Sequence, residues 1–188
     1  PDILSGPLRR GPRAAFALRY VLAATLVPTY GVYSGYELGE NEPASESNEE
    51  YAHSEKYELK DRDYTAPDSL APLLRAVNAI RRRHPDVWGL RDIRFHHSDN
   101  EQFLAYSRGH ADRSLLLCIV NLDPEHPQDT IVRLDLGAMG LSHSVPYQVI
   151  DELTGDSYTW RGPDNYVRLD PAADQVAHIF RVIPQSPA

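Results

Sequence analysis

The sequence contains only one cysteine, Cys118, which excludes a disulfide bond within the chain and fits a reducing compartment. Cys118 lies inside the apolar run LLLCIVNL, so we expect its thiol to be a buried and unreactive part of a strand. Long hydrophobic runs are also absent. The longest one, AAFALRYVLAATLV, is too short to span a membrane and is interrupted by Arg19. A signal peptide is not recognisable.

A basic surface is missing as well. The chain has 27 acidic residues against 19 lysines and arginines, and this net charge of −8 argues against a nucleic-acid-binding protein. The densest basic run, IRRRH at 80–84, lies at the end of an expected helix, where positive charge complements the helix dipole. The sequence also lacks a CxxC pair, a glycine loop that could cradle phosphate, and a Ser-His-Asp set.

The first residues read as the interior of a longer protein. The chain begins Pro-Asp-Ile-Leu, and its only methionine is Met139, so we expect a C-terminal segment. After a loop rich in proline and glycine, apolar residues recur at helical spacing from Arg13 to Leu26, and Pro28 ends this predicted helix. The run TYGVYSGYEL then predicts a short buried strand at 30–36, which would open into a functional loop.

Residues 37–68 form a long acidic segment without periodicity. Connections of this length inside a compact domain are usually functional or disordered. Three tyrosines argue against full disorder because they offer apolar surface that could anchor the segment. They are Tyr51, Tyr57 and Tyr64.

A second helix is predicted from Leu70 to Ile80, where leucine, valine and isoleucine fall on one face before His84 and Pro85 end it. After Val87 the pattern changes to short β-like runs separated by turn residues, which is typical of an all-β sandwich. The runs are IRFHHSD, QFLAYSR, SLLLCIVNLD, TIVRLDLGAM, YQVIDELTG, YTW, YVRLD and AHIFRVI. This order predicts the end of a (β/α)8 barrel in residues 1–86 and a β-sandwich domain in residues 87–188.

The acidic segment contains one candidate binding pair, Lys56 and Tyr57. An ammonium and a phenol hydroxyl side by side could grip a phosphate, which accepts hydrogen bonds from both groups. The competing interpretation is an exposed ion pair between Lys56 and Glu50, Glu55 or Glu58, which would contribute little to stability. From composition alone, the ion pair is the favoured interpretation.

Other carboxylates are weaker candidates. Asp2 would belong to the active-site rim if it followed a barrel strand, but composition alone makes it a terminal, solvated aspartate. Glu37, Glu40 and Asn41 follow the predicted strand, where they could orient other side chains or bind a cation. No histidine or cysteine stands at ligand spacing, so the sequence gives little support to a metal site.

The β region offers two further sets of side chains. His96 and His97 are adjacent in a strand and point to opposite faces, so we expect one core and one surface histidine and no shared metal. Four aromatic residues could form a sugar-stacking platform, although such residues more often pack in a core or between domains. They are Trp88, Tyr158, Trp160 and Tyr166.

A family resemblance is carried by PDIL, VLAATLVPTYGVYSGYELGENEP, EEYAHSEKYELKDRD, VNLDPEHPQ and DELTGDSYTWRGPDNYVRLDP. These segments closely resemble the C-terminal part of the GlgE family, the α-1,4-glucan:maltose-1-phosphate maltosyltransferases of the α-amylase superfamily (glycoside hydrolase family 13). The resemblance covers nearly the whole chain, and YSGYEL together with SEKY is not a general α-amylase feature. It implies the last part of a catalytic (β/α)8 TIM barrel followed by a C-terminal β-sandwich.

The implied reaction transfers maltosyl units from α-maltose 1-phosphate to the non-reducing end of an α-1,4-glucan and releases phosphate, with retention through a covalent glycosyl-enzyme. By position, Asp2 matches the family's transition-state-stabilising acid, and Lys56 and Tyr57 match the pair that binds the phosphate. The nucleophile and the general acid lie upstream in the family, so this chain alone should be inactive. The resemblance also implies a cytoplasmic homodimer without cofactor or metal, and no nucleic-acid or membrane partner.

Two other functions stay open. The β region could be a non-catalytic glucan-binding or assembly module, in which case Trp88→Ala or Trp160→Ala should abolish glucan binding. The parent could instead be a hydrolase or isomerase of the same superfamily. Finally, if most of the barrel is missing, the first helix should expose its apolar face, and residues 1–86 should exchange amide hydrogens faster than residues 87–184.

Overall fold

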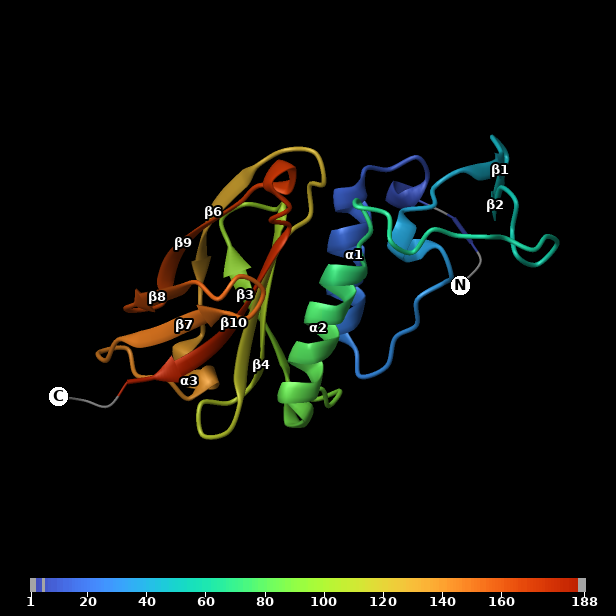
Figure 1. Ribbon diagram of the computed structural model, residues 1–188. Coiled ribbons are helices and arrows are strands. Elements are labelled where there is room, and N and C mark those ends of the chain that lie inside the picture. Colours follow the sequence, from blue (N-terminus) through green and yellow to red (C-terminus); the bar gives the residue numbers. More distant parts are fainter. Residues whose placement is uncertain (1–2, 5, 186–188) are drawn as a thin grey trace.

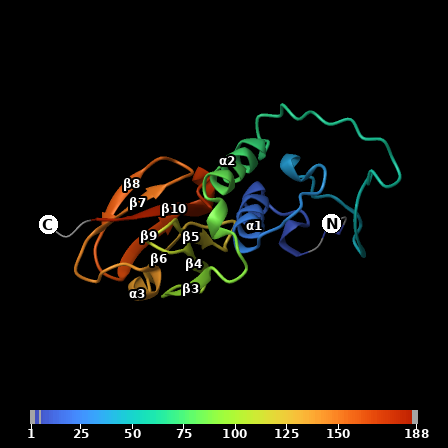
Figure 2. The same ribbon diagram turned by 90° about the horizontal axis from the view of Figure 1, so that it is seen from below.

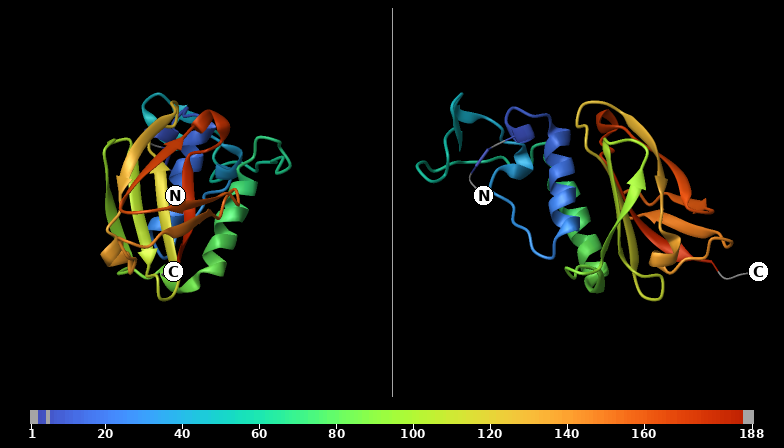
Figure 3. Two further views of the ribbon diagram at one scale, coloured as in Figure 1. Left: turned by 90° about the vertical axis from the view of Figure 1, so that its left-hand side faces the viewer. Right: turned by 180° about the vertical axis from the view of Figure 1, so that it is seen from behind.

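The computed structural model describes residues 3–4 and 6–185, which form three parts arranged side by side (Figure 1). A β domain lies at one end, two helices stand next to each other in the middle, and the N-terminal loops lie at the other end. Seen from below, the acidic segment arches away from the helices (Figure 2). The view from behind shows the same order of the three parts (Figure 3).

The two predicted helices are confirmed. Helix α1 spans Arg13–Leu26 and helix α2 spans Ala71–Arg83. Pro12 stands just before α1, where the lack of an amide proton costs nothing. At the start of α2, the Ser69 hydroxyl accepts a hydrogen bond of 3.1 Å from the first amide of the helix. Helix α2 ends just before Pro85, as expected for a proline that restricts the residue in front of it.

The described residues also contain ten strands and a one-turn helix. Strands β1 (Pro43–Ser45) and β2 (Asn48–Tyr51) form a hairpin within the acidic segment. The C-terminal strands are β3 (Ile93–Ser98), β4 (Phe103–Gly109), β5 (Leu115–Asn121), β6 (Gln128–Arg133), β7 (Tyr147–Asp151), β8 (Ser157–Trp160), β9 (Asp164–Leu169) and β10 (Ala177–Pro184). The short helix α3 (Leu136–Met139) lies between β6 and β7.

Eight strands of the described chain form one antiparallel sheet in the order β8-β7-β10-β5-β4-β3-β6-β9. Strand β3 changes partner along its length: residues 93–96 pair with β4, and residues 97–98 pair with β6. This change lets the sheet curl, so that β6 and β9 lie across from β5 and β10 around a shared core. The prediction of an antiparallel all-β domain is confirmed, but a continuous curled sheet replaces two separate sheets.

Strand β5 is buried along its whole length because both of its faces are covered. Successive side chains of a strand point to opposite faces. Leu115, Leu117 and Ile119 therefore enter the core inside the curled sheet, whereas Leu116 and Val120 pack against the helices. This double burial explains why the run LLLCIVNL is apolar throughout and does not alternate. Cys118 also faces the helices, and burial raises the pKa of its thiol to about 12, as expected for an unreactive core residue.

Arg108 of β4 is 1% exposed and joins the sheet to the helix layer. Its guanidinium donates to the carbonyl oxygens of Thr25 and Leu26, at 3.1 and 3.0 Å, where α1 ends. It also donates to the carbonyl oxygens of Val87 and Gly89, at 2.8 and 2.6 Å, in the linker between α2 and β3. Carbonyls at a helix C-terminus have no partner within the helix and attract a positive charge. One buried cation thus holds α1, the linker and β4 together.

Two local predictions are wrong. The strand predicted at 30–36 is absent, and residues 29–33 are irregular before a turn leads into a short 3-10 helix, Tyr36–Leu38. Strand formation needs a neighbouring backbone, and no other strand of the described residues pairs with this run. The run TIVRLDLGAM is only half a strand. Asp135 accepts a hydrogen bond from the Ala138 amide and thereby starts helix α3.

Helix α1 is apolar on more than one side. Phe16, Tyr20 and Val21 are buried in the core that α1 shares with the sheet. Leu22 and Leu26 are half-buried at the edge of the same core and line a groove of about 450 Å³. The prediction that this helix exposes its apolar face is therefore wrong for most of its apolar residues, because they pack on the sheet and on α2, and only the side along the groove is partly exposed. None of the described helices is long and apolar enough to cross a membrane.

Candidate functional site

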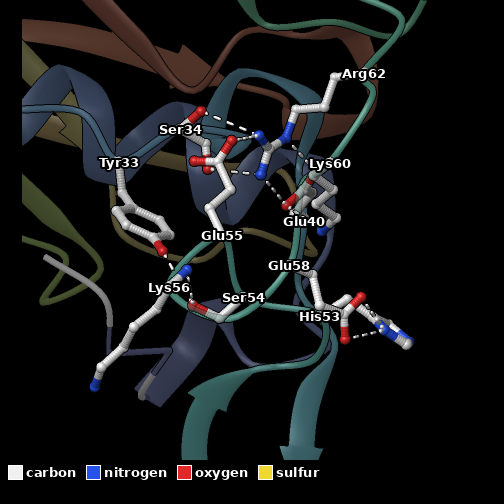
Figure 4. Close-up of polar contacts among 10 residues, drawn as sticks. All are labelled: Tyr33, Ser34, Glu40, His53, Ser54, Glu55, Lys56, Glu58, Lys60 and Arg62. Carbon is white, nitrogen blue, oxygen red and sulfur yellow. Dashed lines mark hydrogen bonds and ion pairs between the residues drawn. The ribbon is translucent and has the colours of Figure 1, made fainter.

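One buried cation, Arg62, ties the acidic segment together and to the loop at Ser34. Its side chain is 4% exposed and donates to Glu40 at 2.7 Å from Nε and 3.2 Å from Nη2 (Figure 4). It also contacts the Ser34 hydroxyl at 3.2 Å and the carboxylate of Glu55. Residues 34, 40, 55 and 62 are thus fixed to one another across the segment. A two-pronged bond between a guanidinium and a carboxylate is both strong and directional.

Glu40 is the centre of this cluster. Lys60 adds a third contact, with Nζ 2.8 Å from Oε2 of Glu40. Burial alone would raise the pKa of Glu40, but the hydrogen bonds from Arg62 and Lys60 outweigh burial and lower it. The same hydrogen bonds to Glu40 raise the pKa of Arg62. The Glu40 carboxylate and the Arg62 guanidinium therefore stay charged, and the sequence-based idea that Glu40 orients other side chains is confirmed.

Glu37 and Asn41, the other two residues of the predicted set, connect the acidic segment to the backbone of neighbouring segments. The Asn41 side chain donates to the Gly11 carbonyl at 2.9 Å, which ties the segment to the loop before α1. The Glu37 carbonyl accepts a hydrogen bond of 2.7 Å from the Leu70 amide, just before α2. Within residues 3–4 and 6–185, no group of three or more acidic, histidine or cysteine side chains is placed to hold a metal ion.

Lys56 and Tyr57 lie at the exposed end of the acidic segment. The Lys56 ammonium is 3.5 Å from Oε1 of Glu50 and 5.3 Å from the centre of the Tyr57 ring. Tyr57 is 68% exposed. Tyr57, and after it Glu50, raise the pKa of Lys56, so its ammonium remains charged. The side chain of Lys56 points away from the cluster around Arg62 (Figure 4). The ion-pair interpretation is thus correct for Glu50, through a long and exposed contact.

The backbone of this end is nevertheless ordered by short-range bonds. Ser54 accepts a hydrogen bond of 3.3 Å from the Lys56 amide, and its carbonyl accepts one of 2.9 Å from the Tyr57 amide. The Tyr33 hydroxyl lies 3.4 Å from the Ser54 hydroxyl (Figure 4). His53 and Glu58 pair across the same turn at 3.2 Å. The turn therefore presents Lys56 and Tyr57 from a defined backbone.

Asp2, the predicted catalytic acid, lies outside the described residues. The segment that follows it runs beside strand β2, because Ile3 forms a β-bridge with Glu50 and the Leu4 amide donates to the Glu49 carbonyl at 2.5 Å. Glu50 is also the partner of Lys56. The structure thus brings residues 3–4 and the Lys56 turn to the same strand, although more than 50 residues of sequence separate them.

The role of Arg62 as the organising residue of the acidic segment is not among the predictions from the sequence. The available signal was charge: the segment is strongly acidic, and its basic residues are Lys56, Lys60 and Arg62. The first two are the only lysines of the whole sequence. A rare cation among many carboxylates indicates a specific pairing, but the pattern does not reveal which of the carboxylates is its partner.

The histidines behave as predicted. His96 is half-buried, with Nε2 2.9 Å from the Ser107 hydroxyl, whereas His97 is exposed and lies 3.1 Å from Asp99. Burial lowers the pKa of His96 to about 4.

The aromatic platform is not formed. Trp88 is buried at 7% exposure, donates to the Arg81 carbonyl at 3.0 Å, and has the Arg81 guanidinium 4.6 Å from its ring centre. Trp160 packs on Phe180 inside the sheet. Of the four aromatic residues proposed for the platform, only Tyr158 and Tyr166 are exposed. Trp88→Ala would therefore test packing and not sugar binding.

The chain is similar to a known family and to curated proteins of that family. Residues 95–182 match the family described as "GLGE, C-terminal". The chain matches the C-terminal part of the GlgE family. It is 48% identical over 186 residues to α-1,4-glucan:maltose-1-phosphate maltosyltransferase 2 of Streptomyces coelicolor, a match that covers 97% of this chain and 27% of the relative.

Two further relatives also match nearly the whole of this chain with about a quarter of their own length. The maltosyltransferase of Corynebacterium glutamicum is 48% identical over 193 residues, which covers 100% of this chain and 28% of that protein. The one from Mycobacterium tuberculosis (strain H37Rv) is 43% identical over 187 residues, covering 97% of this chain and 26% of that protein. The chain thus spans about a quarter of the length of the curated relatives that it matches.

Solved α-amylase structures share the fold at low sequence identity. The α-amylase of Geobacillus thermoleovorans superposes with a TM-score of 0.61 at 14% identity, covering 94% of this chain and 35% of that chain. The maltogenic α-amylase AmyB of Thermotoga neapolitana gives a TM-score of 0.63 at 11% identity, covering 95% of this chain and 38% of that chain. The superposition includes helices and sheet together, so their mutual arrangement is one that α-amylases also contain.

Proposed function

We propose that this chain is the C-terminal segment of a retaining maltosyltransferase, which transfers maltosyl units from α-maltose 1-phosphate to the non-reducing end of α-1,4-glucans and releases phosphate. In this proposal residues 1–86 complete the catalytic barrel and residues 87–188 form the appended β domain. The parent protein is a cytoplasmic homodimer that needs no metal or cofactor. The identity of 48% to maltosyltransferases along nearly the whole chain supports the assignment.

The observation that carries the proposal is the state of Lys56. Its ammonium is charged and exposed, and among the described carboxylates it pairs with Glu50 through a long contact of 3.5 Å, so an anionic group could replace that carboxylate at little cost. Tyr57 stands beside it with an exposed side chain that can donate a second hydrogen bond. A substrate without phosphate would gain nothing from such a cation. Lys56 and Tyr57 therefore bind the phosphate of the donor.

Asp2 is assigned the role of transition-state stabiliser. An acid in this role holds sugar hydroxyls more tightly as the ring flattens toward an oxocarbenium ion. The bridge between Ile3 and Glu50 supports the assignment, because it places the segment next to Asp2 beside the strand that carries the partner of Lys56.

The test is phosphate release from α-maltose 1-phosphate by the full-length parent protein with glucan acceptor. Lys56→Ala should raise KM for the donor about ten- to a hundredfold, since a charge-assisted contact to phosphate is lost. Lys56→Arg should restore part of the loss, because it returns a positive charge. Arg161→Ala, which removes an exposed arginine in the turn before β9, serves as the control for a change of net charge.

The alternative of a hydrolase or isomerase is decided in the same assay. Such an enzyme would act on neutral maltooligosaccharides, and Lys56→Ala would leave its rate unchanged. If the parent releases no phosphate from the donor, or if Lys56→Ala behaves like Arg161→Ala, the assignment of the phosphate site is wrong.

A further inference from the structure

The β domain has a polar cleft of its own, distant from the acidic segment. It has a volume of about 310 Å³ and is formed by the linker before β3, the strands β3 and β4, the turn between β4 and β5, and helix α3. We call it the arginine cleft after the side chains that line it, Arg91, Arg94 and Arg113. In Figure 1 the β4–β5 turn lies at the lower end of the molecule, whereas the hairpin β1–β2 lies at its upper end.

The arginine cleft is positively charged in a protein that is negative overall. Three guanidinium groups line it against the two carboxylates of Asp92 and Asp112, whereas the whole chain has a net charge of −8. No ion pair or side-chain hydrogen bond joins Arg91 or Arg94 to another residue in the part of the chain that the structure describes. These two guanidinium groups are exposed, with all their donors available to a ligand.

The acidic residue nearest to Arg113 is already engaged. Asp112 accepts a hydrogen bond of 2.7 Å from Nδ1 of His110, and Arg113 Nε lies 3.7 Å from the same oxygen. The hydrogen bond from His110 lowers the pKa of Asp112. The Asp112 carboxylate therefore stays ionised, and the three guanidinium groups of the cleft exceed its two carboxylates by one positive charge.

The walls of the cleft are rigid. The His110 ring packs against Gly140, where a Cβ atom would lie 2.3 Å from the ring and where φ is +77°. The turn is closed by hydrogen bonds from the His110 amide to Ser114 and from the Arg113 amide to His110, both 3.0 Å long. Arg94 is paired in register with Ser107 of β4, whose buried hydroxyl also lines the cleft. The arginine side chains therefore extend from a fixed backbone.

We propose that the arginine cleft binds a phosphate group, either free phosphate or a phosphate monoester. Guanidinium groups present planar, forked donors that match the oxygens of phosphate, and their charge remains in a solvated cleft. A dianion suits a site that combines two unpaired arginines with a third that is weakly paired. A single carboxylate would satisfy one fork and leave the others solvated. This site is separate from Lys56 and does not depend on the proposed function.

The experiment is an NMR titration of the purified protein with inorganic phosphate at constant ionic strength. The observed signals are the Nε–Hε groups of the arginines and the backbone amides of residues 109–113. The background variant is Lys56→Gln, so that the proposed donor site does not contribute. We expect saturable shifts, and we expect the double variant Arg91→Gln/Arg94→Gln to weaken binding at least about tenfold. Arg161→Gln is the matched control, since it removes an exposed arginine elsewhere in the β domain and should bind as the background does.

Further arms identify the source of the phosphate group. Glucose 1-phosphate is compared with inorganic phosphate and with glucose. Tighter binding of glucose 1-phosphate would assign the cleft to a phosphate monoester, and equal affinity would assign it to free phosphate. Shifts that do not saturate, or that persist unchanged in the double variant while its circular dichroism matches that of the background, would overturn the proposal.

Discussion

The backbone of Gly35 lies directly against the carboxylate of Glu40, so that a Cβ atom at position 35 would stand 2.4 Å from Oε2. Gly35 also has φ of +90°, in the left-handed region that favours glycine. The turn that begins the acidic segment is therefore built around the same carboxylate that anchors Arg62 and Lys60. Glycine at 35 is needed both for the turn and for the position of that carboxylate.

Gly35→Ala should destabilise the protein more than Gly39→Ala does. Both positions have positive φ, but a Cβ atom at Gly39 would meet nothing within 4 Å. Each substitution therefore costs about 1 kcal/mol or more of backbone strain, and only the first also displaces Glu40. The measurement is the free energy of unfolding in urea. Equal losses in the two variants would show that the contact with Glu40 contributes nothing.

Arg108→Leu should lower the free energy of unfolding by about 3 kcal/mol or more, because buried carbonyl oxygens lose their donors. Arg108→Lys should rescue little, since one ammonium cannot reach the ends of α1 and the linker together. The control is Arg161→Leu, an exposed site, where the change should be small. A near-normal stability of Arg108→Leu would contradict the role of this side chain as the link between helices and sheet.

Stability should fall as the pH drops from about 7 to about 5, partly because of His96. Its Nδ1 accepts a hydrogen bond of 3.2 Å from the Asp135 amide, so the folded state holds the neutral ring, and burial lowers its pKa from 6.5 to about 4. Between these values the unfolded chain binds a proton that the folded chain does not. The stabilisation is thus complete above the unfolded pKa and is lost as the pH falls toward the folded pKa.

The paired variants His96→Gln and His97→Gln isolate this contribution. Burial also lowers the pKa of His84, so the wild-type protein will lose stability for more than one reason. The loss between about pH 7 and about pH 5 should be smaller in His96→Gln and unchanged in His97→Gln, whose side chain is exposed. Urea midpoints at the two pH values provide the comparison. An identical pH dependence in both variants would refute the assignment to His96.

Glu50→Gln in the full-length parent should lower KM for α-maltose 1-phosphate about two- to fivefold, if Lys56 binds the phosphate. Glu50 is the carboxylate that the phosphate must displace, and it would repel the incoming dianion. Glu58→Gln is the matched control, because that carboxylate pairs with His53 on the same turn. A rise of KM in Glu50→Gln would mean that this carboxylate helps to hold the donor.

Amide hydrogen exchange should divide the first 86 residues into two classes. Helices α1 and α2 share a buried core with β5 and should be protected almost as well as the sheet. The turn at 53–66 is mostly exposed and should exchange fast. This pattern replaces the sequence-based expectation of fast exchange throughout residues 1–86, because that expectation did not include the packing of α1 on the sheet. Equal protection of the helices and of the turn at 53–66 would contradict the predicted division into two classes.

The helices and the C-terminal strands could be predicted because their signals are local. Helical spacing of apolar residues ended at prolines in both α1 and α2, and short alternating runs marked most strands of the sheet. The missing strand at 30–36 shows the limit of such signals. A β-prone run becomes a strand only beside a partner, and the composition of the run itself does not show whether that partner is there.

The site was predictable in part for a similar reason. The sequence predicts an ion pair between Lys56 and one of three nearby glutamates, because those residues are close along the chain. The choice of Glu50 depends on the hairpin that brings β2 back toward the turn. Whether Lys56 and Tyr57 bind phosphate stays a prediction, as does the role of Asp2.

The sequence by itself determined the two long helices, most strands of the C-terminal sheet, and the acidic segment that lies between the helices, since these properties follow from spacing and from turn residues. Only the tertiary structure decided where the isolated cations go. Arg62 reaches Glu40 across 22 residues, and Arg108 reaches Thr25 across 83. A charge acts on whatever the fold brings within a few ångströms, so its partner is a property of three-dimensional proximity and not of position along the chain.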